Sequence, residues 1–447
     1  MIFKNARNII ENGLTPEIKK IRADILKIFN SSIEAVNPYN AVIKHIDKNK
    51  LVYDTQVFDL ENFEKIYVVS FGKASIGMTQ AFCDKLNVTK GIVITNQKDK
   101  KVNSDKIETI IGSHPIPNEK SIEGADKIIK LIENCTEKDL LIVLISGGGS
   151  ALLAKPKINL FDLQKTTDLL LKSGANINEI NTIRKHLSYV KGGQLIKNVK
   201  CQVISMIISD IIGDPLEFIS SGPTYPDSTS YEDSLRIIKK YNLIDNVPTS
   251  TINTMKKGIS GNIPETLKSD DPIFKNVSNF IIANNKLACI KAKEKAVELG
   301  YKTIYLTSAI DGEARDIGRF LVEKAKNYET NNKKTLFISG GETTVTIKGK
   351  GKGGRNQEMV LAVVENISDE NIIFSSFASD GVDGMSDAAG AIADKYSLKR
   401  CKEKNILPDG YLNNNDSYNF FKKIGDLLIT NSTGTNVMDI QIIVKFF

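Results

Sequence analysis

The run Ile145 to Leu153, ISGGGSALL, contains the residues whose types and spacing indicate chemistry most directly. It follows an apolar segment, Asp139 to Ile145, that is typical of a buried strand. Successive glycines let the backbone adopt positive φ and bring bare N–H groups close to an anion, and a strand followed by such a turn places a ligand at the carboxyl edge of a doubly wound sheet. A tight turn that binds nothing is the alternative for an isolated Gly-Gly-Gly. The predicted phosphate-binding residues are Ser146, Gly147, Gly148, Gly149 and Ser150.

Two cationic side chains stand at comparable turns. Lys73 lies in a glycine-containing turn after a candidate strand and just before an expected helix, where an ammonium group can meet a phosphate. Arg355 ends a flexible basic loop, Gly349 to Gly354, at the expected start of another helix, and we interpret it as anion-binding. The alternatives are a surface lysine and a hairpin loop.

A second glycine turn, Gly340, Gly341 and Glu342, is expected after the candidate strand Thr335 to Ser339. The segment Asn178 to Gly193 gathers Arg184, Lys185, His186, Ser188 and Lys191 into a short helical stretch. Here a solvated helix face is an equal alternative.

Carboxylates follow other candidate strands. Asp210 and Asp214 end a strongly apolar run, and Asp380 follows a later one. Carboxylates at strand ends hold Mg²⁺ together with substrate phosphates, or accept a hydroxyl proton. For each single aspartate a helix cap or an Asx turn is the alternative.

In combination and order, these motifs resemble those of the ADP-forming glycerate 2-kinase family of the MOFRL type, whose members are also often labelled hydroxypyruvate reductase. The resemblance runs from about residue 5 to the C-terminus. One departure is Asn431 to Asn436, where the family usually has Thr-Gly-Pro before Thr-Gly-Thr-Asn. The motifs are FGKAS, GSHPIPNEKS, SGGGSALL, EINTIRKHLSYVKGG, ISDIIGDP, SSGPTYPD, SGGETTV, GKGGRNQE, SDGVDGMSDAAGA and STGTNVMD.

The resemblance implies a Rossmann-like N-terminal domain, a smaller α/β C-terminal domain and an active site in the cleft between them. It implies transfer of the ATP γ-phosphoryl group to the 2-hydroxyl of D-glycerate, with Mg²⁺, and leaves a homodimer open. Lys73 and Arg355 match the family's charged catalytic pair, and Asp210 or Asp214 its acidic catalytic or metal position. Asp380 is a further candidate metal ligand from its place after a strand and is not carried over from the family. The turn from Ser146 to Ser150 matches the nucleotide phosphate loop. The expected substrate-binding residues are Arg184, Lys191, Gly340, Gly341 and Glu342.

Two other functions are considered. A hydroxypyruvate reductase that uses NAD(P)H needs a dinucleotide fingerprint, and no GxGxxG follows a strand with an acidic residue about 20 positions on. A non-catalytic sensor of sugar acids or phosphates would not need Lys73, Arg355 and several strand-end carboxylates together.

Composition favours a soluble cytoplasmic protein. No apolar run reaches the ~18 residues that span a bilayer. The 5 cysteines are scattered and without CxxC spacing, so neither a disulfide framework nor a zinc site is expected. The net charge of +7 is spread along the chain without a long basic block, which argues against nucleic acid as a partner.

The elements that must position these residues alternate between apolar runs and amphipathic stretches, which predicts an α/β fold. We expect a domain over residues 1–245, an irregular connection over 246–275, and a second α/β domain over 276–447 whose first strand is Asn279 to Ala283.

Overall fold

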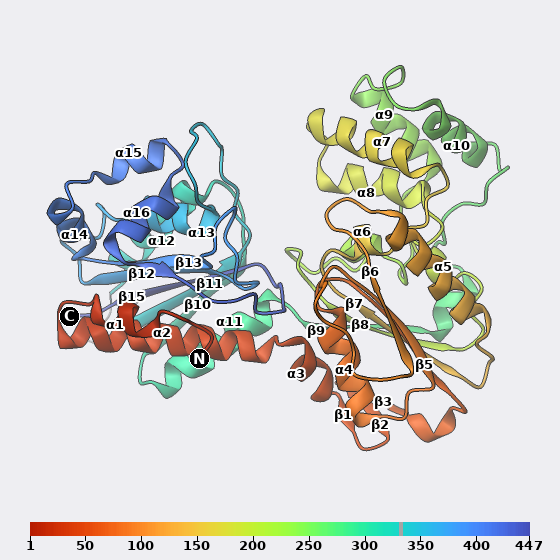
Figure 1. Cartoon of the computed structure of the whole chain (residues 1–447), viewed down its shortest axis with the longest axis horizontal. Helices are drawn as coiled ribbons and strands as arrows, with labels where there is room; N and C mark the ends of the chain where they lie inside the picture. Colours follow the sequence, from red (N-terminus) through yellow and green to blue (C-terminus); the bar gives the residue numbers. More distant parts are fainter. Residues whose placement is uncertain (330–333) are drawn as a thin grey trace. The chain divides into compact units, whose positions relative to one another are not determined.

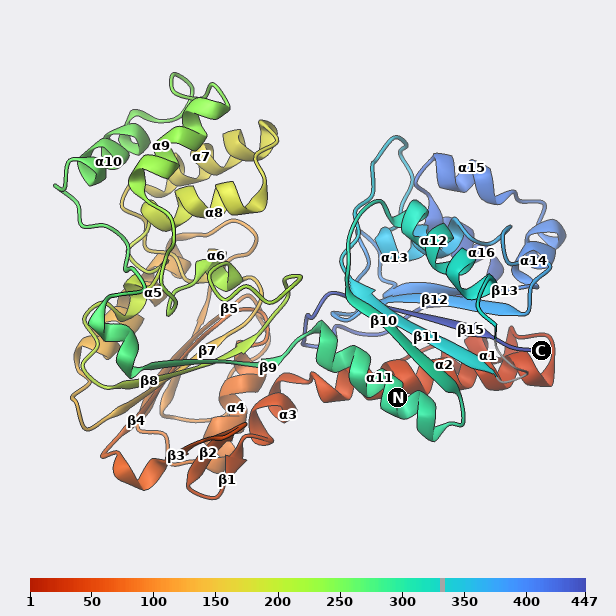
Figure 2. The ribbon, with the colours of Figure 1, turned by 180° about the vertical axis from the view of Figure 1, so that it is seen from behind.

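The computed structural model describes residues 1–329 and 334–447 and divides the chain into two compact units (Figures 1 and 2). One unit is residues 38–282, and the other combines residues 1–37 with 283–447. The expected α/β class is confirmed for both. The division differs from the expected boundaries because the N-terminal segment packs with the C-terminal half of the chain.

A six-stranded sheet forms the centre of unit 38–282, in the order β6-β5-β4-β7-β8-β9. The pairs β5–β6, β4–β5, β4–β7 and β7–β8 are parallel. Every residue of β7 is buried, as expected for a continuous apolar run covered on both faces. The strands are β4 (Ile66–Phe71), β5 (Lys90–Thr95), β6 (Ile107–Ile111), β7 (Leu140–Ile145), β8 (Gln202–Ile208) and β9 (Val277–Ala283).

The strand order creates a topological switch point. From β4 the chain adds β5 and β6 on one side of the sheet and then returns to add β7 and β8 on the other side of β4. In open α/β sheets, ligands bind at the carboxyl ends of the strands where the order reverses. The turns after β4 and β7, which contain Lys73 and the three glycines, stand at that position.

The last strand of this sheet corrects one expectation. We expected Asn279 to Ala283 to open the second domain, but β9 lies beside β8 at the edge of the first sheet. An apolar run shows that a strand is buried without showing which sheet it joins.

Helices cover the sheet of unit 38–282, and α7 to α10 form a cluster with its own apolar core (Figure 1). Because α10 lies within residues 246–275, that connection is less irregular than expected. A small antiparallel sheet, β1 (Ile46–Asp47), β2 (Lys50–Tyr53) and β3 (Gln56–Asp59), completes the unit. The helices are α3 (Pro38–Ile43), η1 (Leu60–Asn62), α4 (Ser75–Lys85), α5 (Glu119–Glu133), α6 (Gly149–Leu152), α7 (Leu160–Lys172), α8 (Ile177–His186), η2 (Gln194–Ile196), η3 (Ile219–Ser221), α9 (Tyr231–Lys240), α10 (Thr249–Ile259) and η4 (Pro272–Asn276).

The second unit is built on a mixed six-stranded sheet in the order β10-β11-β15-β12-β13-β14. Only β10–β11 is a parallel pair, and β15, the last strand in the sequence, is inserted antiparallel between β11 and β12. The strands are β10 (Lys302–Ile310), β11 (Thr335–Gly341), β12 (Ile372–Ala378), β13 (Gly390–Asp394), β14 (Leu427–Leu428) and β15 (Asp439–Lys445).

Helices lie on both faces of this mixed sheet. The long helix α2 lies beside α11 on one face, and α12, α13 and α16 lie on the other (Figures 1 and 2). The N-cap of α2 is Thr15, whose hydroxyl accepts a hydrogen bond from the Ile18 amide, followed by a proline in the first turn. The helices are α1 (Ala6–Glu11), α2 (Pro16–Ala35), α11 (Asn285–Glu298), α12 (Ala314–Lys326), α13 (Arg355–Leu361), α14 (Ser397–Glu403), α15 (Pro408–Asn413) and α16 (Ser417–Ile424).

A buried ion cluster fastens the N-terminal segment to the C-terminal half. Arg22 of α2 is fully buried and contacts Asp394 at 2.5 Å and Asp426 at 2.7 Å. Arg400 shares both carboxylates, at 3.1 and 2.7 Å. Removing one partner would leave a buried charge uncompensated, so the cluster fixes how α2 joins this unit.

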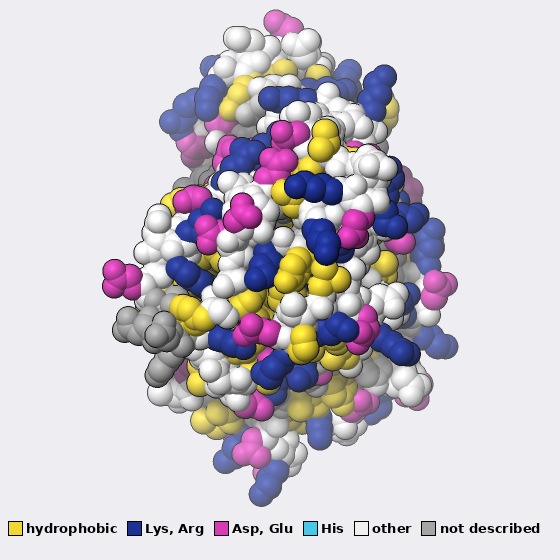
Figure 3. Space-filling model, turned by 90° about the vertical axis from the view of Figure 1, so that its left-hand side faces the viewer, with side chains coloured by type: hydrophobic (Ala, Val, Ile, Leu, Met, Phe, Trp, Pro, Cys, Tyr) yellow, Lys and Arg dark blue, Asp and Glu magenta, His cyan; other side chains and the backbone are white. Residues whose placement is uncertain are grey.

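The surface charge is mixed. On the face in Figure 3, Lys and Arg side chains alternate with Asp and Glu, so the excess positive charge is not gathered into one patch there. No helix within the described ranges is long and apolar enough to cross a membrane.

Candidate anion-binding site at the switch point

The turns after β4 and β7 interlock through their backbones. The Lys73 amide donates to the Gly147 carbonyl at 2.9 Å, and the Ala74 amide donates to the Ser146 hydroxyl at 3.1 Å. Gly72 has φ of +123°, and a Cβ there would lie only 2.2 Å from the Ser146 Oγ. The close approach requires glycine, and it places Lys73 directly beside the glycine turn.

Gly148 marks the point where the turn becomes helix α6. Its φ is +83°, and a Cβ there would lie 2.9 Å from Cδ2 of His114 and 3.4 Å from Cγ of Lys73. Burial, helped by the charge of Lys73, lowers the pKa of His114 to about 4. A neutral imidazole and a lysine side chain therefore flank the turn. His114 was missed as a site residue, although its motif was noticed.

Asp210 reaches the same turn from the end of β8. A Cβ on Gly147 would lie 2.1 Å from its Oδ2, so the carboxylate packs against the glycine backbone. Asp214 follows in a left-handed conformation with φ of 56°. Asp380 belongs to the other unit, where its Oδ1 accepts the Val382 amide at 3.0 Å, the Asx turn considered as the alternative. Within the described residues no three His, Cys, Asp or Glu side chains are grouped to hold a metal.

Two strained serines brace the turn, and they were missed as site residues although their motif was noticed. Ser220 and Ser221 have φ of 51° and 63°, values unfavourable for residues with a Cβ. The Ser220 hydroxyl donates to the Ser146 carbonyl at 3.1 Å, and the Ser221 and Ser150 hydroxyls are 2.8 Å apart. Strain of this kind persists where the surroundings enforce it, and it clusters at functional sites.

A cavity of about 270 Å³ opens beside the glycine turn. Gly148, Ser150, Arg184 and Lys191 all line it, so the structure brings these predicted residues together, with His114 as an additional wall. They come from the turn after β7, from α8 and from the segment that follows α8. The helical stretch predicted over residues 178–193 ends at His186, and Lys191 lies beyond it.

The two cations of the cavity have different environments. Arg184 is half-buried, and among the described residues no side-chain hydrogen bond or ion pair is made by its guanidinium. Burial lowers the pKa of Arg184. The Lys191 ammonium instead donates to the carbonyls of Ser150 and Leu153 at 2.7 and 3.1 Å, and burial together with Arg184 lowers its pKa to about 7. Arg184 is thus available to an anion, while Lys191 holds the turn in place.

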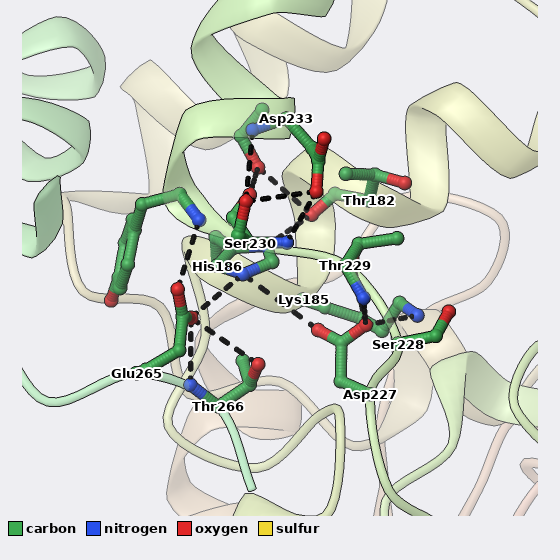
Figure 4. A network of polar contacts seen from close by, with 12 residues as sticks. Thr182, Lys185, His186, Asp227, Ser228, Thr229, Ser230, Asp233, Glu265 and Thr266 are labelled. Carbon is green, nitrogen blue, oxygen red and sulfur yellow. Dashed lines mark hydrogen bonds and ion pairs between the residues drawn. The ribbon is translucent and has the colours of Figure 1, made fainter. Parts of the chain in front are cut away.

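A buried network anchors α8, the helix that carries Arg184 (Figure 4). The Lys185 ammonium lies 2.7 Å from Asp227 and 2.6 Å from Glu217. The neighbouring His186 places Nε2 2.9 Å from a carboxylate oxygen of Glu265. These side chains fix the helix on the side away from the cavity, so Lys185 and His186 are structural residues.

In the other unit, Arg355 begins α13, as predicted. Its guanidinium is held by Asp439, with Nε–Oδ2 at 2.5 Å and Nη2–Oδ1 at 3.1 Å, and by Glu342 at 2.6 Å. Burial lowers the pKa of Arg355, but the two carboxylates outweigh it and raise the pKa above its ordinary value. The arginine is therefore a permanently charged, fixed fork. Asp439 was missed as a site residue, although it ends the last motif of the sequence.

The α13 N-terminus is already occupied. The amides of Asn356 and Gln357 donate to the buried Asp383 carboxylate at 3.1 and 2.8 Å. These two amides are therefore not available to a ligand, and the Arg355 guanidinium is the candidate anion-binding group at this point.

Two expectations about the neighbouring loops are corrected. Gly340 and Gly341 form no turn because they are the last residues of β11 and pair with β15. Glycine is needed at both positions, since a Cβ would lie 2.0 Å from Asn285 and 2.2 Å from Ile310. The basic loop before Arg355 is not loose, since the amides of Lys348 to Lys352 bond to residues 414–416.

The fold and site thus define an α/β protein of two units, with a glycine turn at a sheet switch point as the candidate anion-binding site. Two family profiles match the chain, a domain of unknown function (DUF4147) over residues 24–256 and the MOFRL family over residues 335–439. A glycerate 2-kinase of Pyrococcus horikoshii is 42% identical, covering 94% of this chain and 97% of its own. A D-glycerate 2-kinase of Thermotoga maritima is 38% identical, covering 95% and 98%. A putative hydroxypyruvate reductase of Agrobacterium vitis is 34% identical, covering 94% of both chains.

A crystal structure of glycerate kinase from Thermotoga maritima matches with a TM-score of 0.85 at 36% identity, over 96% of this chain and 100% of that one. The chain belongs to the DUF4147/MOFRL glycerate 2-kinase family.

Proposed function

We propose that this protein is a glycerate 2-kinase that transfers the γ-phosphoryl group of ATP to the 2-hydroxyl of D-glycerate, giving 2-phosphoglycerate and ADP. The observation that carries the proposal is similarity along nearly the whole chain to relatives named glycerate 2-kinase. The switch-point turn supports it, because phosphoryl transfer depends mainly on positioning and neutralising phosphate oxygens.

In this proposal the turn from Ser146 to Ser150 holds the nucleotide phosphates through backbone amides other than those of Ser146 and Gly149, which donate to the carbonyls of Phe71 and Ser146. Lys73, fixed to that turn by its own amide, neutralises the transferring group. Arg184 binds an anionic oxygen of the nucleotide or the glycerate carboxylate. We revise the expected role of Lys191 from substrate binding to positioning, because its ammonium bonds two carbonyls of the turn.

The residues at the turn fit a Mg²⁺ ion of the kind that one or two carboxylates and substrate phosphates hold together. Asp210, packed against Gly147, is the carboxylate that would hold it there. When bound, the metal would neutralise phosphate charge. Asp214 stays a second candidate for this position or for the base that accepts the hydroxyl proton, and Asp380 is less favoured because it closes an Asx turn.

The proposal also requires that Arg355 acts on the same phosphoryl group as Lys73. The fork of Arg355 is oriented by Asp439 and Glu342 and keeps partial exposure, with 31% of its side-chain surface accessible. Its planar guanidinium suits two phosphoryl oxygens. Glu342 then acts by orienting Arg355.

Purified protein tests the proposal. We expect ADP release that depends on D-glycerate, ATP and Mg²⁺, with 2-phosphoglycerate identified as the product by phosphorus NMR. Oxidation of NADH or NADPH with hydroxypyruvate is the parallel assay, since some relatives are named putative hydroxypyruvate reductase. Nicotinamide turnover without kinase activity would overturn the proposal, and binding of ATP or glycerate without turnover of either kind would favour a sensor.

A further inference from the structure

We propose that the cavity between α7 and α8 binds the purine base of the nucleotide, with the phosphates at the glycine turn. The inference rests on the proposed kinase function and extends it to α7, a helix that lies outside the motifs that carry the family resemblance. This helix forms the wall of the cavity farthest from the glycine turn, and the sequence predicted the helix without assigning it a function.

The cavity is polar at one end. Lys191 bonds the carbonyl of Ser150, and Gly148 and Ser150 belong to the phosphate turn, so these residues mark where phosphates would enter. Arg184 adds a guanidinium without a protein carboxylate, and it is near enough to Lys191 to lower the pKa of that group. A ligand in this cavity therefore has an anionic part at this end.

The remaining wall is chiefly apolar. Leu163, Thr167 and Leu171 line it from α7, at the spacing of four that places side chains on one helix face. Leu170, three residues after Thr167 and seven after Leu163, lies on an adjoining part of the same helix surface and is only 1% exposed in the helical core. α7 thus meets the helical core and the cavity with adjoining parts of its surface, and Leu163 contacts both.

Two large apolar side chains at this wall remain open to solvent. Ile116 and Leu171 are each 59% exposed, although both line the cavity. Covering them would remove apolar surface from water, which favours a ligand with a flat hydrophobic part. Figures 1 and 2 show α7 and α8 stacked beyond α6, the short helix that follows the turn.

D-glycerate does not match this wall, because each of its three carbons carries oxygen and none can use an apolar surface. A purine combines apolar faces with polar edges, and the wall offers polar partners in Gln164 and Asp168. Gln164 also donates to the Pro117 carbonyl at 3.0 Å and so links α7 to the loop of Ile116.

Titration calorimetry of the full-length protein with Mg·ADP, inorganic tripolyphosphate and D-glycerate tests the inference. Thr167→Trp fills the cavity, and Leu171→Asp places a charge on its exposed rim. We expect both to weaken ADP binding by about tenfold or more while leaving tripolyphosphate and D-glycerate affinities unchanged. The matched control is Lys165→Trp, which adds the same ring to an exposed position of the same helix and should change nothing.

Unchanged ADP affinity in both variants would overturn the inference, as would an equal loss of tripolyphosphate affinity or a selective loss of D-glycerate binding. Hydrogen exchange of the unmodified protein gives a second readout that does not depend on a variant folding. ADP should slow exchange in α7 and around Ile116, and tripolyphosphate should not. Because these measurements need no turnover, a wild-type protein that binds ADP but fails to phosphorylate D-glycerate would refute the proposed function separately.

Discussion

At the scale of single residues, two glycines with the same backbone conformation allow the cost of backbone strain to be measured separately from a role in ligand binding. Gly148 and Gly174 have nearly the same left-handed φ, +83° and +79°. A Cβ on Gly148 would crowd His114 and Lys73, whereas a Cβ on Gly174 meets nothing within 4 Å. The pair therefore provides a substitution and a control with equal backbone cost.

We predict that Gly148→Ala and Gly174→Ala each lower stability by about 1–2 kcal/mol, the cost of a left-handed residue with a Cβ. Only Gly148→Ala should weaken ATP binding, because it displaces the lysine and blocks approach of the phosphates. Urea titration and calorimetry measure the two effects. Equal ATP affinity in both variants would show that the turn serves folding alone.

At the scale of elements, α8 is the helix whose placement sets Arg184. Burial raises the pKa of Glu265, but the hydrogen bond and charge of His186 and two backbone amides outweigh it and lower the pKa from 4.5 to about 2. A carboxyl with a depressed pKa stabilises the fold above its unfolded pKa and loses that contribution as the pH falls through the folded value.

We predict that Glu265→Gln destabilises the protein at pH 7 by about 1 kcal/mol, a value reduced for solvent screening because the side chain is 36% exposed. The difference from wild type should shrink as the pH falls from 4.5 towards 2. Urea titrations across this range measure it. Glu64→Gln, at an exposed pair with Lys138, is the control and should show a smaller effect. A difference independent of pH would mean that the ion pair does not stabilise α8.

Most elements of the fold followed from the sequence, because buried strands appear as continuous apolar runs and amphipathic helices as periodic patterns. β7 and α7 occur over the predicted residues. The edge strand β6 was missed, since only part of it is buried and its pattern is short. The sequence also could not predict which of the two units contains β9 and which contains α2. Strand pairing and helix packing join segments that lie far apart in the chain.

The sequence predicted candidate site residues where a glycine-rich turn, or a charged side chain in a turn, indicated them. Lys73, Gly148 and Asp210 were predicted, and the structure places them together. The strained pair Ser220 and Ser221 was missed because serine carries no sign of positive φ in its sequence context. Orienting groups such as Asp439 were missed because their role depends on a contact across the sheet.

At the scale of the whole molecule, Arg22 shows how the chain's two ends form one unit. We predict that Arg22→Met lowers the stability of the unit formed by residues 1–37 and 283–447 by about 3–5 kcal/mol, because Asp394 and Asp426 lose a buried partner. Hydrogen exchange should rise in β13 and α16 and stay unchanged in β7. Arg7→Met, which removes the same charge from an exposed position, is the control. Equal protection in both variants would contradict the role given to this cluster.

The central claim is the proposal that Lys73 and Arg355 stabilise one transferring phosphoryl group, and a double-mutant cycle on kcat for D-glycerate phosphorylation tests it most directly. Lys73→Ala and Arg355→Ala should each lower kcat by about 10²–10³-fold, as expected for removal of a preorganised charge, with smaller changes in KM. The double variant should lose less than the product of the two single losses, because residues that act on the same group are not additive. Lys65→Ala and Arg319→Ala, at exposed positions, should leave kcat unchanged. Near-wild-type kcat in either single variant, or losses that multiply fully in the double variant, would contradict the mechanism.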